Sequence, residues 1–174
     1  NRDVAMHIAH TADSQHPIAA VLGCVDSRLP IEMIFDVGVG DLFVNRVIGN
    51  VVNDDVIAGL EYACGVAGAK LIVVVGYNRC IAVQSAIDSV QGKQLPYVRG
   101  CEYLKPIVQS LESVVRESDI SNRQVPNEKE TRGVTDIENI VRRNVQRSVH
   151  EILQKSTAIS ELVASGRVGI VGMV

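Results

Sequence analysis

Aromatic residues are scarce in this sequence: they make up 3 % of its 174 residues, and tryptophan is absent. A core with so few rings must be built from Val, Ile, Leu and Ala, a composition that suits helices packed on a parallel sheet. A chain of this length can bury one substantial core, and one domain is the default. We therefore expect a single α/β domain over residues 1–174.

Long apolar runs are also missing, since no stretch approaches the roughly 20 residues that span a bilayer. The first residues, NRDVAMHIAH, lack the apolar stretch and small-residue cleavage site of a secretory signal. We expect a soluble protein with no membrane span. The cytoplasm is favoured as its compartment, and the periplasm or an organelle stays open because a leader removed before Asn1 would leave no trace.

An excess of positive charge is absent as well. The formal net charge is −3, the isoelectric point is near 5.8, and Lys and Arg are scattered except between Arg142 and Arg147. Such a balance gives no electrostatic footprint for nucleic acid, which is therefore not an expected partner.

The four cysteines are too few and too widely spaced for a disulfide scaffold, so buried thiols or metal ligands fit them better.

What the sequence does have is an alternation of apolar runs with segments of helical periodicity. The expected strands cover residues 18–24, 42–48, 70–77 and 167–174, and the expected helices cover residues 53–69, 80–90 and 134–154. The polar interval 117–133 is expected to be a loop within the domain. This order predicts a mostly parallel central sheet flanked by helices and joined by right-handed crossovers.

Three polar clusters follow the first three expected strands: GCVDSR, NRVIGN and GYNRC. Ligands of parallel sheets bind beyond the carboxyl ends of the strands, so these clusters should meet at one edge. Cys24 and Cys80 would then supply two thiolates for one zinc ion, which is half of a tetrahedral site. The equally good alternative from spacing alone is that both are small buried core residues.

The segments GCVDSR, GDLFVNRVIGNVV and LEYACGVAGAKLIVVVG, followed by Cys80, resemble in this order the β-class carbonic anhydrases. The resemblance covers about residues 15–90, with a weaker echo in SGRVGIVG. It implies a β-carbonic-anhydrase-like fold, a homodimer or dimer of dimers, and a helical N-terminal arm (about residues 1–14) that packs on the partner subunit. It also implies reversible hydration of carbon dioxide to bicarbonate at a zinc site.

Carried over residue by residue, the resemblance implies that Cys24 and Cys80 are zinc ligands and that Asp26 and Arg28 are a hydrogen-bonded catalytic pair beside them. Zinc lowers the pKa of its bound water toward about 7, so that hydroxide can attack carbon dioxide. Arg28 would hold Asp26 ionised and oriented. Asp26 would then accept a hydrogen bond from the zinc-bound hydroxide or handle its proton.

The second motif departs from the family pattern of His-x-x-Cys followed by a small residue. Tyr77 stands at the histidine position and Ile81 at that of the small residue. A phenol is a poor zinc ligand unless ionised, and a third anion would weaken the pull of the metal on water. Asp26 could coordinate zinc instead, at the cost of its pairing with Arg28. We expect zinc to be weakly bound or absent, and activity to be weakened or lost.

Two other interpretations stay open. One is a non-catalytic relative of the family, metal-poor, with a structural role or an anion bound through Arg28. The other is redox chemistry between Cys24 and Cys80, which requires the two sulfurs to lie within disulfide reach. Rescue of the metal site by His16 is not expected, because this histidine precedes Cys24 by a whole strand and should lie at the opposite end of the sheet.

Overall fold

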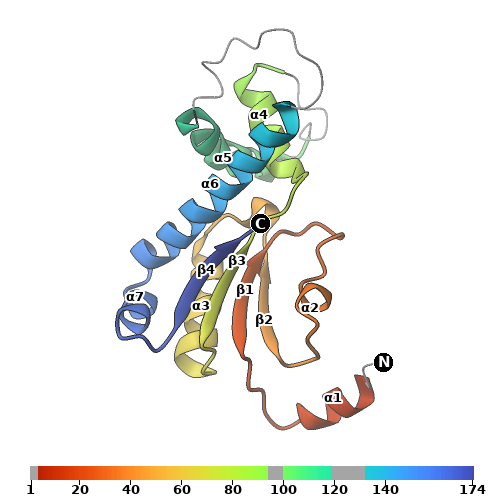
Figure 1. Cartoon of the computed structure of the whole chain (residues 1–174), viewed down its shortest axis with the longest axis vertical. Coiled ribbons are helices and arrows are strands. Elements are labelled where there is room, and N and C mark those ends of the chain that lie inside the picture. Colours follow the sequence, from red (N-terminus) through yellow and green to blue (C-terminus); the bar gives the residue numbers. More distant parts are fainter. Residues whose placement is uncertain (1–3, 94–99, 119–131) are drawn as a thin grey trace.

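The central element of the fold is a parallel sheet. The structure is a computed structural model that describes residues 4–93, 100–118 and 132–174. Its sheet has the order β2-β1-β3-β4, and each neighbouring pair is parallel (Figure 1). The strands are β1 (Ala19–Gly23), β2 (Leu42–Arg46), β3 (Leu71–Val75) and β4 (Gly169–Met173). The expected α/β class and all four expected strands are confirmed.

Helices connect and flank these strands. They are α1 (Val4–His10), α2 (Ile31–Ile34), α3 (Asp54–Glu61), α4 (Ile81–Val90), α5 (Lys105–Glu117), α6 (Arg132–Lys155) and α7 (Thr157–Ala164). Shorter turns are the 3-10 turns η1 (Ile48–Asn50) and η3 (Glu102–Leu104), and the π-helical turn η2 (Tyr62–Val66). Within the described ranges, none of these helices has both the length and the apolar character needed to cross a bilayer.

The expected helices are present, with adjusted ends. Asn53 caps α3 as predicted, because its side chain accepts a hydrogen bond of 2.9 Å from the N–H of Val56. Cys80 occupies the N-cap position of α4, and its side chain makes no capping bond. Helices α2, α5 and α7 were not predicted. Most of the expected loop at 117–133 lies outside the described residues.

The two central strands, β1 and β3, are buried on both faces, which explains why they read as continuous apolar runs. The edge strand β4 is mostly exposed. Val21 and Val73 point to one face, where they share a core with residues of α4 and α5. Leu22 and Ile72 point to the other, where they pack with residues of α3 and α7. Helix α6 is long enough to contribute to both cores, and it crosses the end of the sheet diagonally (Figure 1).

The crossing of α6 requires a residue without a side chain at the end of β3. A methyl group added at Gly76 would lie 2.7 Å from Val145 Cγ2 and 2.8 Å from Val141 Cγ1. We therefore expect Gly76→Ala to lower the free energy of unfolding by about 1–3 kcal/mol through overpacking. Chemical denaturation would measure this loss. Gly65→Ala is the matched control, because nothing lies within 4 Å of the added methyl group and stability should not fall.

Candidate active site

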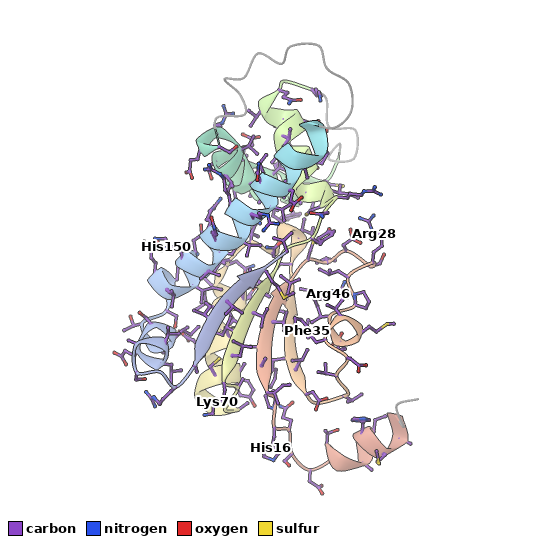
Figure 2. All side chains as sticks on the ribbon, in the orientation of Figure 1. His16, Arg28, Phe35, Arg46, Lys70 and His150 are labelled. Carbon is purple, nitrogen blue, oxygen red and sulfur yellow. The ribbon has the colours of Figure 1, made fainter. Side chains whose placement is uncertain are left out.

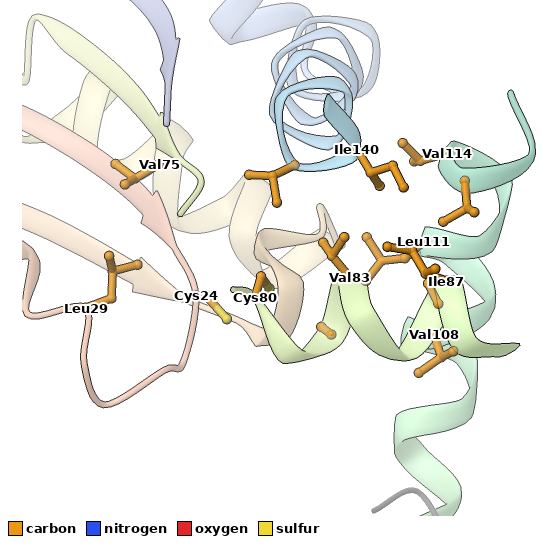
Figure 3. Packing of buried hydrophobic residues seen from close by; sticks show 14 of the residues in the cluster. Cys24, Leu29, Val75, Cys80, Val83, Ile87, Val108, Leu111, Val114 and Ile140 are labelled. Atoms are coloured by element: carbon orange, nitrogen blue, oxygen red, sulfur yellow. The ribbon is translucent and has the colours of Figure 1, made fainter. Parts of the chain in front are cut away.

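Three strand ends form the candidate site, as the sequence predicts. Cys24 follows β1 directly, η1 follows β2, and the segment from Gly76 to Cys80 joins β3 to α4. Cys24 and Cys80 are both buried, and Figure 3 shows them side by side at the start of α4. Residues far apart in the chain are thus brought together at the carboxyl edge of the sheet.

Asp26 and Arg28 form a two-pronged ion pair on the loop after β1. Arg28 Nε donates to Asp26 Oδ1 at 2.9 Å and Arg28 Nη2 to Asp26 Oδ2 at 2.6 Å, while the Arg28 backbone N–H also donates to Oδ1. These hydrogen bonds hold the pKa of the Asp26 carboxyl well below its usual range. Asp26 is therefore an ionised carboxylate with both oxygens engaged.

The side chain of Arg46, the last residue of β2, holds the same loop by hydrogen bonds to backbone carbonyl oxygens of that loop. Its Nε donates to the carbonyl oxygen of Cys24 at 3.1 Å, and its Nη2 donates to that of Asp26 at 2.5 Å. A guanidinium that bridges two carbonyls fixes the direction in which the intervening side chains project. Asp41, which precedes β2, accepts a hydrogen bond from the Gly38 N–H.

The hydroxyl of Tyr77 sits between the carboxylate and the first cysteine. It donates to Asp26 Oδ2 at 2.9 Å and lies 3.5 Å from Cys24 Sγ, to which it can also donate. Burial, followed by the hydrogen bonds to Cys24 and Cys80, raises the pKa of the Tyr77 phenol far above its ordinary value. Tyr77 is thus a neutral hydrogen-bond donor in this site.

Cys24 is the sulfur on which the donors converge. A hydrogen bond from the Cys80 thiol is the main reason that the pKa of Cys24 is lowered to about 5; burial opposes it, and Tyr77 contributes further lowering. The Gly49 backbone N–H donates to Cys24 Sγ at 3.3 Å. The pKa of Cys80 is raised, first by its bond to Cys24 and then by burial. One thiolate and one thiol therefore share the site.

A cavity of about 290 Å³ adjoins these groups. Cys24, Asp26, Tyr77 and Ser85 supply the polar groups of its lining, and the other lining residues are apolar. Ile81, in the first turn of α4, lines this cavity and remains 58 % exposed. An apolar pocket with a few polar groups at one end is the usual form of a small-molecule site.

The donor atoms present do not fit a catalytic zinc ion. Such an ion takes three protein ligands and leaves a fourth position for water. Cys24 and Cys80 provide two ligands, but Tyr77 keeps its proton and Asp26 is committed to Arg28 and Tyr77. In the part of the chain that the structure describes, no three His, Cys, Asp or Glu side chains are grouped to hold a metal.

His16 and His150 lie away from this pocket (Figure 2). His16 precedes β1 at the opposite end of the sheet from Arg28 and Arg46, as expected, and His150 lies on α6 (Figure 2). Sequence reasoning missed the role of Gly49, whose backbone N–H reaches Cys24 Sγ. Only the glycine in the segment IGN signalled an unusual turn there.

Comparison with known proteins connects this arrangement to a known class of enzyme. A family model described as carbonic anhydrase matches residues 19–174. Carbonic anhydrase 2 of Mycobacterium tuberculosis is 35 % identical over 171 residues, which cover 96 % of this chain and 73 % of that protein. The carbonic anhydrase of Mycolicibacterium smegmatis is 32 % identical over 164 residues, covering 94 % and 72 % of the two chains.

Solved structures agree at the level of the fold. A tetrameric β-carbonic anhydrase from Sordaria macrospora superposes with a TM-score of 0.77 at 24 % identity, covering 95 % of this chain and 78 % of that one. A β-carbonic anhydrase from Aspergillus fumigatus superposes with a TM-score of 0.76 at 25 % identity, covering 95 % and 73 %. The parallel sheet and its flanking helices are therefore shared with these enzymes.

Proposed function

Because this chain belongs to the β-carbonic anhydrase family, we propose that its pocket descends from a site for reversible hydration of carbon dioxide to bicarbonate, and that zinc binding and hydration are strongly weakened or lost here. In the family, zinc supplies a hydroxide at neutral pH. Tyr77 and Ile81 stand where the family pattern has a histidine and a small residue, and these two replacements account for the loss of zinc binding and hydration.

The observation that carries the proposal is the position of the Tyr77 hydroxyl. It donates to Asp26 Oδ2 at 2.9 Å and lies 3.5 Å from Cys24 Sγ. A neutral phenol in this place donates to the carboxylate that Arg28 also holds, and it lies beside the sulfur where the family pattern has a metal-binding imidazole. Removing the phenolic proton beside a thiolate and a carboxylate would cost further free energy, because like charges repel at short range.

Arg28 and Arg46 hold the Asp26 carboxylate ionised and in place without the help of a metal ion. Arg28 holds Asp26 ionised, and Arg46 fixes the loop on which Asp26 lies. These donors are already engaged with protein oxygens, so binding of an anion through Arg28 would compete with its bond to Asp26. This competition makes the anion-binding alternative the weaker one. Redox chemistry between Cys24 and Cys80 stays the second interpretation, because the two free thiols are hydrogen-bonded to each other and the pKa of Cys24 is lowered.

We also propose that the chain assembles as a homodimer or dimer of dimers, with the arm at about residues 1–14 against a partner subunit. Met6 and Ile8 of α1 and Met33 of α2 are exposed apolar side chains in this chain, and burial of such side chains favours association. Light scattering on the purified protein would give its mass in solution.

Zinc analysis combined with a hydration assay tests the proposed function. Protein produced with ample zinc should contain far less than one equivalent of the metal, and stopped-flow mixing with carbon dioxide should give a rate close to that of buffer. A full equivalent of zinc together with rapid hydration would refute the proposal. A full equivalent of zinc without hydration would refute the proposed loss of zinc binding and leave the proposed loss of hydration standing.

A further inference from the structure

Two buried polar side chains on α6 hold the turn η1 that follows β2. Asn144 Nδ2 donates to the carbonyl oxygen of Gly49 at 2.9 Å, and Ser148 Oγ donates to that of Asn50 at 3.0 Å. Asn144 is 3 % exposed and Ser148 is 2 % exposed. Both bonds therefore form away from water, where an unpaired partner would be costly. Being four residues apart, the two side chains lie on one face of α6.

The turn that they hold is conformationally demanding. Gly49 has φ 66° and Asn50 has φ 43°, both in the left-handed region. A methyl group added at Gly49 would lie 2.9 Å from Leu111 Cδ1, so α5 also presses on the turn. Non-glycine residues keep such a conformation only where surrounding contacts fix it. The hydrogen bonds from Asn144 and Ser148 are contacts of this kind.

The opposite side of the same turn faces the candidate site. Gly49 presents its carbonyl to Asn144, and its N–H donates to Cys24 Sγ at 3.3 Å. A hydrogen bond to a sulfur orients it and stabilises negative charge on it, and the groups that support such a bond tune the site without touching the reacting atoms. Gly49 thus connects Asn144 of α6 to the sulfur of Cys24 through two hydrogen bonds, one at its carbonyl oxygen and one at its N–H.

We propose that Asn144 and Ser148 are positioning residues, which act through η1 to keep the Gly49 N–H directed at Cys24 Sγ. Neither side chain makes a hydrogen bond to the sulfur itself. The proposal goes beyond the proposed function, because it concerns the protein's own thiol and holds with or without zinc or hydration activity.

Amide NMR spectroscopy of the whole chain tests this role directly. In Asn144→Ala, exchange of the Gly49 amide proton with solvent should become at least about tenfold faster, while the amides of β1 keep their protection. Ser148→Ala deletes a single oxygen and should produce a smaller change in the same direction. It keeps the proposal testable if Asn144→Ala fails to fold. Asn139→Ala, an exposed position on the same helix, is the matched control.

A second readout separates positioning from general support of the fold. Cys24→Ala should move the Gly49 amide proton shift in the starting protein, because it removes the hydrogen bond to sulfur. In the Asn144→Ala background the same replacement should move that shift much less. An unchanged Gly49 amide in both Asn144→Ala and Ser148→Ala would overturn the proposal. So would an equal response in Asn139→Ala, or a Cys24→Ala effect that Asn144→Ala leaves undiminished.

Discussion

Changing Tyr77→His and Ile81→Gly together should give a protein that binds zinc and hydrates carbon dioxide at least about a hundredfold faster than the starting chain, since a zinc-bound water ionises near pH 7. The first change replaces a protonated phenol with a neutral imidazole, a good zinc ligand. It also frees Asp26 Oδ2 from the Tyr77 hydroxyl. The second removes a β-branched side chain from the cavity lining. Elemental analysis and stopped-flow hydration measure the two outcomes.

The matched control for this double change is Tyr62→His, which adds an imidazole at a half-exposed tyrosine of η2 outside the cavity lining. It should leave zinc content and hydration as they were. Tyr77→His alone should recover zinc better than Ile81→Gly alone, because only the first adds a ligand atom. If the double variant stays metal-free while remaining folded, the obstacle to zinc lies outside these two positions.

Cys24 should react with iodoacetamide at a rate that is half-maximal near pH 5 in chelator-treated protein, because the hydrogen bond from Cys80 lowers its pKa to about 5. Only the thiolate reacts, so the rate should rise as pH increases through this value and then level off. An ordinary cysteine, with a pKa of about 8.5, would still be mostly unreactive at pH 7. Peptide mass spectrometry identifies which cysteine is modified at each pH.

The same difference in pKa bears on stability. The folded value of Cys24 lies below that of the unfolded chain, so its contribution to folding is present in full above about pH 8.5. It declines as pH falls and is lost through about pH 5.

In the alkylation experiment with iodoacetamide, the internal control is Cys64, because burial raises the pKa of its thiol. The exposed Cys101 is removed as Cys101→Ser. Tyr77→Phe should move the Cys24 midpoint upward, whereas a midpoint above pH 8 in the starting protein would contradict the assignment.

The sheet could be predicted from the sequence because strands buried on both faces leave unbroken apolar runs, as in the segment that became β3. Helix α5 was missed although its signals are present: Pro106 lies in its first turn, and Val108, Leu111 and Val115 recur at helical spacing and are buried. The four-residue α2 leaves no periodic pattern to detect.

The candidate site was predictable in its side chains and not in its backbone. Cys24, Asp26 and Tyr77 follow strand ends, and the topology of a parallel sheet places such positions together. The Gly49 donor depends on two consecutive left-handed residues, and no side-chain motif encodes the direction of an N–H. Arg46 lies in the cluster NRVIGN, but its partners are backbone carbonyl oxygens of the loop after β1, and no side-chain motif encodes these.

The parallel order of the strands has a consequence for how the site comes into being during folding. No neighbouring pair in the sheet can be joined by a hairpin; Ala19 pairs with Leu71, and Leu71 pairs with Gly169. Each pairing closes a long loop before any contact repays the lost entropy, which makes such folds slow. The pairing of β1 with β3 is what places Cys24 and Cys80 close together. Until then each is an ordinary separate thiol, so the shared proton and the lowered pKa are properties of the completed sheet.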